Sequence, residues 1–198
     1  MIYFFRHGET LWNSEHRYQG SLNSDLTPKG IAQIEDACLA FSVTEEYIHP
    51  IKVFVSPLGR AQETARILSR YADVVLIEDN RLREVSLGSW DGKTKAEIEK
   101  LYPDLLRNSK PYNWHFYSPD GESLQSAKSR IKSWLSDVED YTVCAVAHGM
   151  IGRVLIGLYL NLSDDEMLKM SIAQDSYYKL TDGKVYTIGN GVLHADEA

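Results

Sequence analysis

The sequence predicts an α/β fold, a three-layer sandwich in which helices cover both faces of a mainly parallel central sheet and an antiparallel strand lies at its edge. The first observation is that apolar runs of strand length alternate with helical patterns along the 198 residues. The second is that two of these runs, at residues 2–5 and 143–147, end beside a histidine that is followed by glycine. The length suits one domain, residues 1–198, with a sizeable core.

The first half of the chain supplies three of the expected strands. Thr27 and Pro28 are suited to begin a helix, as N-cap and first helical residue, and apolar residues at helical spacing follow them. These apolar residues are Ile31, Ile34, Ala37, Cys38 and Phe41. The other expected elements are a strand at 2–5, a loop at 8–26, a strand at 51–55 that Ser56-Pro57 ends, a helix at 58–71, a strand at 74–77 and a loop at 78–93.

The second half of the chain is expected to be mostly helical before it ends in strands. Residues 103–121 contain three prolines and an aromatic group at 112–117, and we expect them to be irregular. The expected helices lie at 94–102, 122–141 and 149–160, with a further one after Ser163. A strand at 143–147 precedes the third of these helices, and strands at 172–180 and 185–188 flank the turn Asp182-Gly183.

Composition excludes several classes of function. The chain has 21 basic and 28 acidic residues, a net charge of −7, which argues against binding to nucleic acid or to an anionic membrane. No apolar run reaches the ~20 residues of a membrane span. The first strand begins at residue 2, which leaves no room for a signal peptide, and the two cysteines form no disulfide framework. We therefore expect a cytoplasmic protein.

Metal and nucleotide chemistry are not indicated either. The six histidines show no spacing typical of a metal site, and the glycines do not form a phosphate-binding loop of the P-loop type. The histidines are residues 7, 16, 49, 115, 148 and 194. We expect neither a metal nor a cofactor.

The polar residues at the two strand ends point to phosphoryl chemistry. In open α/β sheets, ligands bind beyond the carboxyl ends of the strands, so His7 and His148 can meet in one crevice although 141 positions separate them. A neutral imidazole is a nucleophile at neutral pH. Arg6 and Arg60, each just past a strand end, offer the planar fork of donors that matches phosphate oxygens.

These residues lie within a longer pattern that resembles the histidine phosphatase superfamily, also called the phosphoglycerate mutase-like family. The pattern covers residues 2 to about 153, and its blocks occur in order at sensible spacing. The blocks are Arg6-His7-Gly8-Glu9-Thr10 with Trp12-Asn13, Arg17-Tyr18-Gln19-Gly20, Leu26-Thr27-Pro28-Lys29-Gly30, Ser56-Pro57-Leu58-Gly59-Arg60-Ala61, Leu82-Arg83-Glu84 with Gly88-Ser89-Trp90, Gly121-Glu122-Ser123 and Ala147-His148-Gly149.

The resemblance implies a role for each of these residues. It implies a phosphohistidine intermediate on His7, with Arg6, Arg60 and His148 stabilising the phosphoryl group. Glu84 is the candidate general acid, which protonates the leaving oxygen and later takes a proton from water. The resemblance also implies that the phosphate and substrate site is lined by Asn13, Gln19 and Gly20, and that residues from about 85 to 121 form a cap-like segment.

Three functions remain open on the sequence alone. The first is a metal-independent phosphomonoesterase that hydrolyses a small phosphorylated metabolite through phosphohistidine. The second is a phosphoglycerate mutase, which returns the phosphoryl group to its substrate, and the third is a non-catalytic binder of phosphorylated ligands. The chain is expected to be a monomer or a homodimer. The aromatic group at 112–117 either contacts substrate or is ordinary packing.

We expect hydrolysis over mutase activity. A mutase must exclude water and hold a second phosphate, and in the mutases that this chain resembles a longer insert between the acid and the second histidine does so. Here only 63 residues, positions 85–147, separate Glu84 from His148. Most of the basic residues in that stretch fall at helix-surface positions by pattern. The basic residues there are Lys93, Lys95, Lys100, Arg107, Lys110, His115, Lys128, Arg130 and Lys132.

Overall fold

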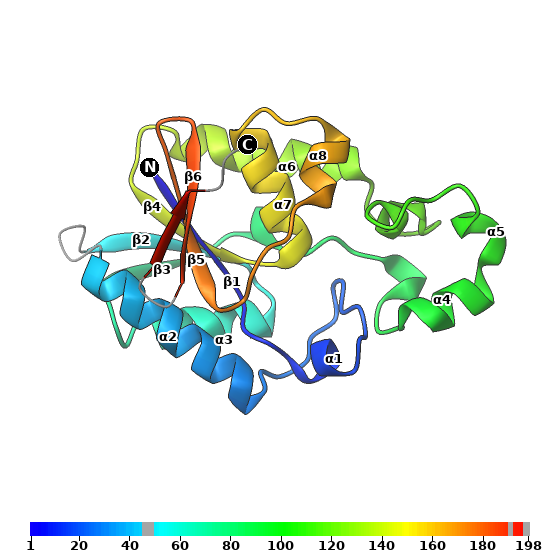
Figure 1. The fold of residues 1–198 in the computed structure, drawn as a ribbon, viewed down its shortest axis with the longest axis horizontal. Coiled ribbons are helices and arrows are strands. Elements are labelled where there is room, and N and C mark those ends of the chain that lie inside the picture. Colours follow the sequence, from blue (N-terminus) through cyan, green and yellow to red (C-terminus); the bar gives the residue numbers. More distant parts are fainter. Residues whose placement is uncertain (45–49, 190–191, 196–198) are drawn as a thin grey trace.

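The computed structural model describes residues 1–44, 50–189 and 192–195 and shows an α/β sandwich built on a seven-stranded sheet (Figure 1). The strand order is β3-β2-β4-β1-β5-β6-β7. The parallel strands are β3 (Val74–Glu78), β2 (Ile51–Val55), β4 (Val143–Ala147) and β1 (Ile2–Arg6). The antiparallel strands are β5 (Ser176–Thr181), β6 (Lys184–Gly189) and β7 (Val192–Ala195). The predicted fold class is confirmed, with three antiparallel strands in place of one.

Helices cover both faces of the sheet because the central strands are apolar on both sides. In β1, Tyr3 and Phe5 face a cluster that includes residues of α2 (Pro28–Thr44) and α3 (Gly59–Leu68). Phe4, whose side chain points the other way, belongs to the cluster formed with α6 (Leu124–Val138), α7 (Gly149–Tyr159) and α8 (Asp164–Lys169). A strand buried on both faces is a continuous apolar run, which is what residues 2–5 show.

Strand register brings the two histidines together. In the parallel pair of β1 and β4, Arg6 lies opposite Ala147, so the next residues, His7 and His148, leave the sheet at the same edge. The backbone N–H of His7 donates to the carbonyl of Ala147 at 3.1 Å. The close approach of the following turn to α2 requires glycine, because a Cβ on Gly8 would lie 2.3 Å from the carbonyl oxygen of Gly30.

Several expected loops contain short helices. The loop at 8–26 includes α1 (Leu11–Ser14), which Thr10 and Asn13 cap reciprocally. The segment at 103–121 includes α5 (Pro103–Leu106) and a 3₁₀ turn at Trp114–Tyr117, so the expectation of an irregular segment was wrong for those residues. Two more 3₁₀ turns, Asn80–Leu82 and Gly88–Trp90, lie in the loop at 78–93. Single turns of this kind carry too little apolar periodicity to be predicted.

Some details of the elements differ from the expectations. Residues 172–175 are not in a strand, and β5 begins at Ser176. The helix expected at 122–141 is α6 at Leu124–Val138, whose N-cap is Ser123. Ile31 was expected on the buried face of α2, but it is 36% exposed because the helix packs through Ile34, Ala37, Cys38 and Phe41.

The segment that contains α4 (Lys95–Leu101) and α5 projects from one end of the sandwich (Figure 1). A small separate cluster of buried residues holds it together: Leu87, Trp90, Ile98 and Trp114. Trp114 therefore serves packing, while Tyr112 and Phe116 pack against the cluster that contains α6 and α7. Whether this segment acts as a cap stays a prediction. Within the described ranges, no helix has both the length and the apolarity needed to cross a bilayer.

Candidate active site

The rings of His7 and His148 lie in contact at the carboxyl edge of the parallel strands. Their centroids are 5.2 Å apart and their planes are inclined by 59°. Both side chains are buried, with 3% exposure for His7 and none for His148. The two strand-end histidines therefore meet, as expected, although only His7 lines the cavity described below.

The hydrogen bonds of His7 fix its tautomer. Nδ1 lies 2.8 Å from the carbonyl oxygen of Gly8, and because a carbonyl only accepts, Nδ1 must carry the hydrogen. Nε2 accepts from Nε of Arg60 at 3.2 Å, so it carries a lone pair. Burial first, and then the charges of Arg60 and Arg6, hold the pKa of His7 well below its usual value. His7 is therefore neutral at neutral pH, with Nε2 as its basic atom.

His148 is also held neutral. Burial is the largest cause of the lowering of its pKa, followed by the charge of Arg60. A phosphate dianion would favour a protonated His148, but without a ligand the ring is neutral because burial and the charge of Arg60 act against protonation. Nε2 lies 2.7 Å from Oγ of Ser56, which itself accepts the backbone N–H of Leu58 at 3.3 Å. We assign the Ser56 hydroxyl as donor to Nε2, which leaves the hydrogen on Nδ1, a buried atom without a hydrogen-bond partner among the described residues.

Arg60 lies in the first turn of α3 and is 2% exposed. Besides His7, its guanidinium donates to the carbonyl of Leu22 at 2.6 Å and to that of Gly20 at 3.0 Å. Burial, its largest influence, lowers the pKa of Arg60 to about 10, so the side chain stays charged at neutral pH.

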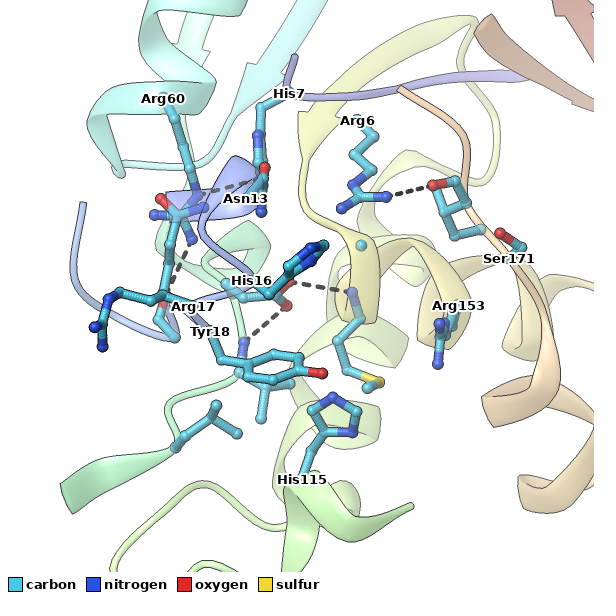
Figure 2. A pocket seen from close by; sticks show the side chains of 18 residues that line it. Arg6, His7, Asn13, His16, Arg17, Tyr18, Arg60, His115, Arg153 and Ser171 are labelled. Carbon is cyan, nitrogen blue, oxygen red and sulfur yellow. Dashed lines mark hydrogen bonds between the residues drawn. The ribbon is translucent and has the colours of Figure 1, made fainter. Parts of the chain in front are cut away.

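Arg6 approaches from the end of β1 on the other side of the site (Figure 2). One terminal nitrogen donates to the carbonyl of Ile172 at 2.6 Å, while Nε is buried without a partner in the described chain. A Cβ at Gly149 would lie 3.3 Å from the Arg6 guanidinium, so glycine permits this approach. A buried donor without a partner is costly unless a ligand supplies the acceptor.

The side chain of Glu84 lies against the N-terminus of α7, the helix that begins directly after His148. Its Oε2 accepts the N–H of Met150 at 3.1 Å, and its Oε1 accepts those of Ile151 at 3.2 Å and Val85 at 2.9 Å. The first N–H groups of a helix have no partner within the helix, and the side chain of Glu84 supplies acceptors for two of them. The structure thus fixes this carboxyl group in the same cavity as His7.

The three residues proposed to line the phosphate site make hydrogen bonds to other residues of the protein. Oδ1 of Asn13 accepts from the backbone of Thr10 and from Nε2 of Gln174, both at 3.2 Å. Gln19 donates to Oγ1 of Thr10 at 2.8 Å, and its Oε1 is buried without a partner in the described chain. The carbonyl of Gly20 accepts from Arg60.

These groups open on a cavity of about 300 Å³, the lower end of the range for small-molecule sites (Figure 2). Seven of the predicted site residues line it: Arg6, His7, Asn13, Gln19, Gly20, Arg60 and Glu84. His148 does not line the cavity, and its ring lies against that of His7.

Sequence reasoning missed further polar residues of this cavity. They are His16, Arg17, Tyr18, His115, Arg153 and Ser171. The ring of His115 stacks on Trp114 with centroids 4.0 Å apart and lines the cavity. A usable signal existed for Arg153, which lies four residues after Gly149 and therefore on the same face of a helix that begins at the site.

No three described His, Cys, Asp or Glu side chains gather as a metal site would require. His49 and the side chain of His194 lie outside the described residues. The absence of a metal requirement stays a prediction, which chelation tests.

Comparison with known proteins identifies the class. The family model of the histidine phosphatase superfamily (branch 1) matches residues 2–185, and the chain belongs to this family. It is thus a phosphatase of the class that uses a histidine nucleophile.

Three relatives show the range of proteins that resemble the chain. A probable phosphoglycerate mutase, GpmB of Enterobacter sp. (strain 638), is 30% identical, covering 98% of this chain and 94% of that protein. Phosphoserine phosphatase 1 of Hydrogenobacter thermophilus is 33% identical over 76% of this chain and 71% of its own. The structure of a mycobacterial glucosyl-3-phosphoglycerate phosphatase with VO3 matches with a TM-score of 0.78 and 25% identity, covering 100% of this chain and 97% of that one.

Proposed function

We propose that this protein hydrolyses a phosphate monoester of a small metabolite, without a metal ion, through a phosphohistidine on Nε2 of His7. The observation that carries the proposal is the state of His7. Its Nε2 holds a lone pair in a neutral ring, with the guanidinium groups of Arg60 and Arg6 beside it. A neutral nucleophile between two permanent cations suits attack on a dianionic phosphoryl group, because catalysis of this transfer is mainly positioning and charge stabilisation.

The first step transfers the phosphoryl group to the enzyme. Nε2 of His7 forms a bond to phosphorus while the bond from phosphorus to the leaving oxygen breaks, and Glu84 supplies the proton that this oxygen needs. Substrate must first replace the contact of Arg60 with Nε2, because that contact occupies the lone pair. Arg60, Nε of Arg6 and Nδ1 of His148 then donate to the phosphoryl oxygens.

The second step releases phosphate. Glu84 accepts a proton from water, the water oxygen bonds to phosphorus, and the bond between phosphorus and Nε2 breaks. The carbonyl of Gly8 accepts from Nδ1 throughout, so the ring keeps one orientation. Relatives named for phosphoserine and for glucosyl-3-phosphoglycerate support a metabolite as the substrate.

The proposal is tested with His7→Ala and the wild type on a panel of phosphorylated metabolites. The wild type should release phosphate in the presence of EDTA and should carry acid-labile, alkali-stable phosphate on His7 after an alkaline quench, whereas the variant should be inactive. Full activity of the variant would disprove the nucleophile, and loss of activity in EDTA that added divalent ions restore would disprove the metal independence.

Mutase activity is the second candidate, because a relative is named a probable phosphoglycerate mutase. Incubation with 3-phosphoglycerate and catalytic 2,3-bisphosphoglycerate distinguishes the two. Hydrolysis predicts phosphate release with little 2-phosphoglycerate. Rapid formation of 2-phosphoglycerate, faster than phosphate release from every panel substrate, would assign a mutase instead.

A further inference from the structure

The guanidinium of Arg153 is the feature of the cavity that the proposed reaction does not use. Arg153 lies on α7 and lines the cavity, and one terminal nitrogen donates to the carbonyl of Leu168 at 2.8 Å. Among the described residues no carboxylate lies within the 4.0 Å of an ion pair. A ligand in the cavity could therefore accept hydrogen bonds from its remaining N–H groups. A half-buried cation without an ion-pair partner is costly, and a negatively charged ligand would lower that cost.

The two other basic groups on this side of the cavity, Arg17 and His115, are either paired with carboxylates or neutral. Arg17 is bonded to Glu15 at 3.2 Å and to Glu97 at 2.9 Å, so two carboxylates compensate its charge. Burial, and then the charges of Arg153 and Lys95, lower the pKa of His115 to about 3, so this ring is neutral at neutral pH. Arg153 therefore carries a positive charge that forms no ion pair among the described residues, and the charge of Glu84 acts on it only from a longer distance.

The position of Arg153 separates it from the phosphoryl end of the cavity. Figure 2 shows His7 and Arg60 on one side and Arg153, His115 and Tyr18 on the other. The ring of Tyr18 packs on His115 with centroids 5.5 Å apart. Glu84 is the nearby acid, and both its oxygens already accept backbone N–H groups. A substrate whose phosphorus lies at His7 would therefore extend its alcohol part towards Arg153.

We propose that Arg153 binds a carboxylate on the alcohol part of the substrate, so that the preferred substrates are phosphate esters of small hydroxy acids. The inference rests on the proposed function. A guanidinium matches a carboxylate with two parallel hydrogen bonds. A single positive charge balances a carboxylate but not a second phosphate dianion, so the same observation favours one phosphate per substrate and hydrolysis over mutase activity.

The kinetic test compares two substrates that differ in the carboxylate. 3-Phosphoglycerate carries it, and glycerol 3-phosphate has a hydroxymethyl group in its place. The wild type should favour 3-phosphoglycerate in kcat/KM by about 10- to 100-fold, the range for a hydrogen-bonded charge pair. Equal kcat/KM values for the two would overturn the inference.

Variants of Arg153 separate recognition from structure. Arg153→Gln should remove the preference for 3-phosphoglycerate, chiefly by raising the KM for this substrate. The kcat/KM values for glycerol 3-phosphate and p-nitrophenyl phosphate should stay within about threefold of the wild-type values. Arg153→Lys should keep part of the preference because the charge remains. Arg66→Gln, an exposed arginine that pairs with Glu63, is the matched control and should change nothing. Equal losses on all substrates in both Arg153 variants would show a structural role and overturn the inference.

Binding of compounds that cannot be hydrolysed tests carboxylate recognition separately from the proposed chemistry. Phosphonoacetate, 3-phosphonopropionate and 4-phosphonobutyrate carry a carboxylate at three distances from a phosphonate that cannot be hydrolysed, and propylphosphonate lacks it. For the wild type, calorimetry should show at least one carboxylated compound binding about 10-fold more tightly than propylphosphonate. For Arg153→Gln, the carboxylated compounds and propylphosphonate should bind with similar affinity. Such discrimination without turnover of any ester would refute the proposed function alone, and turnover without discrimination would refute the inference alone.

Discussion

At the scale of single residues, the chemistry depends on which ring nitrogens carry hydrogens. Nδ1 of His7 donates to a carbonyl oxygen, and Nε2 accepts from a guanidinium. Nε2 is therefore the ring nitrogen that carries the basic lone pair. With the Ser56 hydroxyl assigned as the donor to Nε2 of His148, the hydrogen of that ring is on Nδ1. Hydrogen-bond partners thus set the tautomers, and burial first, followed by the charges of the nearby arginines, keeps both rings unprotonated.

Glu84 gives the prediction at this scale. Glu84→Gln removes the proton donor but keeps a side chain of the same size at the N-terminus of α7. Turnover of an alkyl phosphate should fall by about 10²- to 10⁴-fold, because its leaving oxygen needs a proton. p-Nitrophenyl phosphate should lose much less, because p-nitrophenolate leaves unaided.

The measurement is kcat for both esters, with thermal unfolding as the control for folding. If both esters lose the same factor, Glu84 only positions α7 through its bonds to Met150 and Ile151.

At the scale of elements, the site depends on how closely the turn after β1 packs on α2. A Cβ on Gly30 would lie 2.0 Å from the carbonyl oxygen of Glu9, a backbone atom that cannot move alone. Thr27, just before α2, donates to the carboxylate of Glu9 at 3.0 Å, and Lys29, in the first turn of α2, does so at 2.8 Å. α2 thereby fixes the turn that carries His7.

Gly30→Ala should consequently affect both stability and activity. We expect a loss of about 1–3 kcal/mol in the free energy of unfolding, the usual cost of overpacking, and a lower kcat as the turn after His7 shifts. Urea unfolding and phosphate release measure the two effects.

Leu39→Ala is the control on the same helix. Leu39 is 54% exposed, so its truncation should change the free energy of unfolding by no more than about 0.5 kcal/mol. If Gly30→Ala were as mild as this control, the contact with Glu9 would not determine the turn.

At the scale of the whole molecule, burial of three histidines links stability to pH. The folded protein holds the pKa values of His7, His148 and His115 below the ordinary value, chiefly by burial, and that of His115 at about 3. When the pH falls below about 6.5, the unfolded chain binds protons on these residues that the folded chain does not bind. The free energy of unfolding should therefore be highest above that pH and decrease as the pH falls, by up to about 1.4 kcal/mol per pH unit for each histidine.

Urea unfolding at pH 7.5, 6.5 and 5.5 checks the direction. His115→Phe should make the dependence shallower by about one histidine's share, up to about 1.4 kcal/mol per pH unit. A free energy of unfolding that rises towards pH 5.5 would contradict the assignment of neutral buried rings.

The sequence by itself determined the α/β class, the strand ends at which His7 and His148 lie, and the positions of the chemistry-bearing residues, because these follow from local periodicity and from motifs of neighbouring residues. It did not determine where short turns form helices, as at Leu11–Ser14 and Pro103–Leu106, because four residues carry too little pattern.

Only the tertiary structure decided which side chains share the cavity and in which protonation state. Arg17, His115 and Arg153 come from a loop, the projecting segment and α7, and nothing in their own neighbourhoods places them together. The lowered pKa of His7 likewise comes from burial and from Arg60, 53 positions away in the chain. Packing between distant elements creates such contacts and desolvation, and neither exists in any window of the sequence.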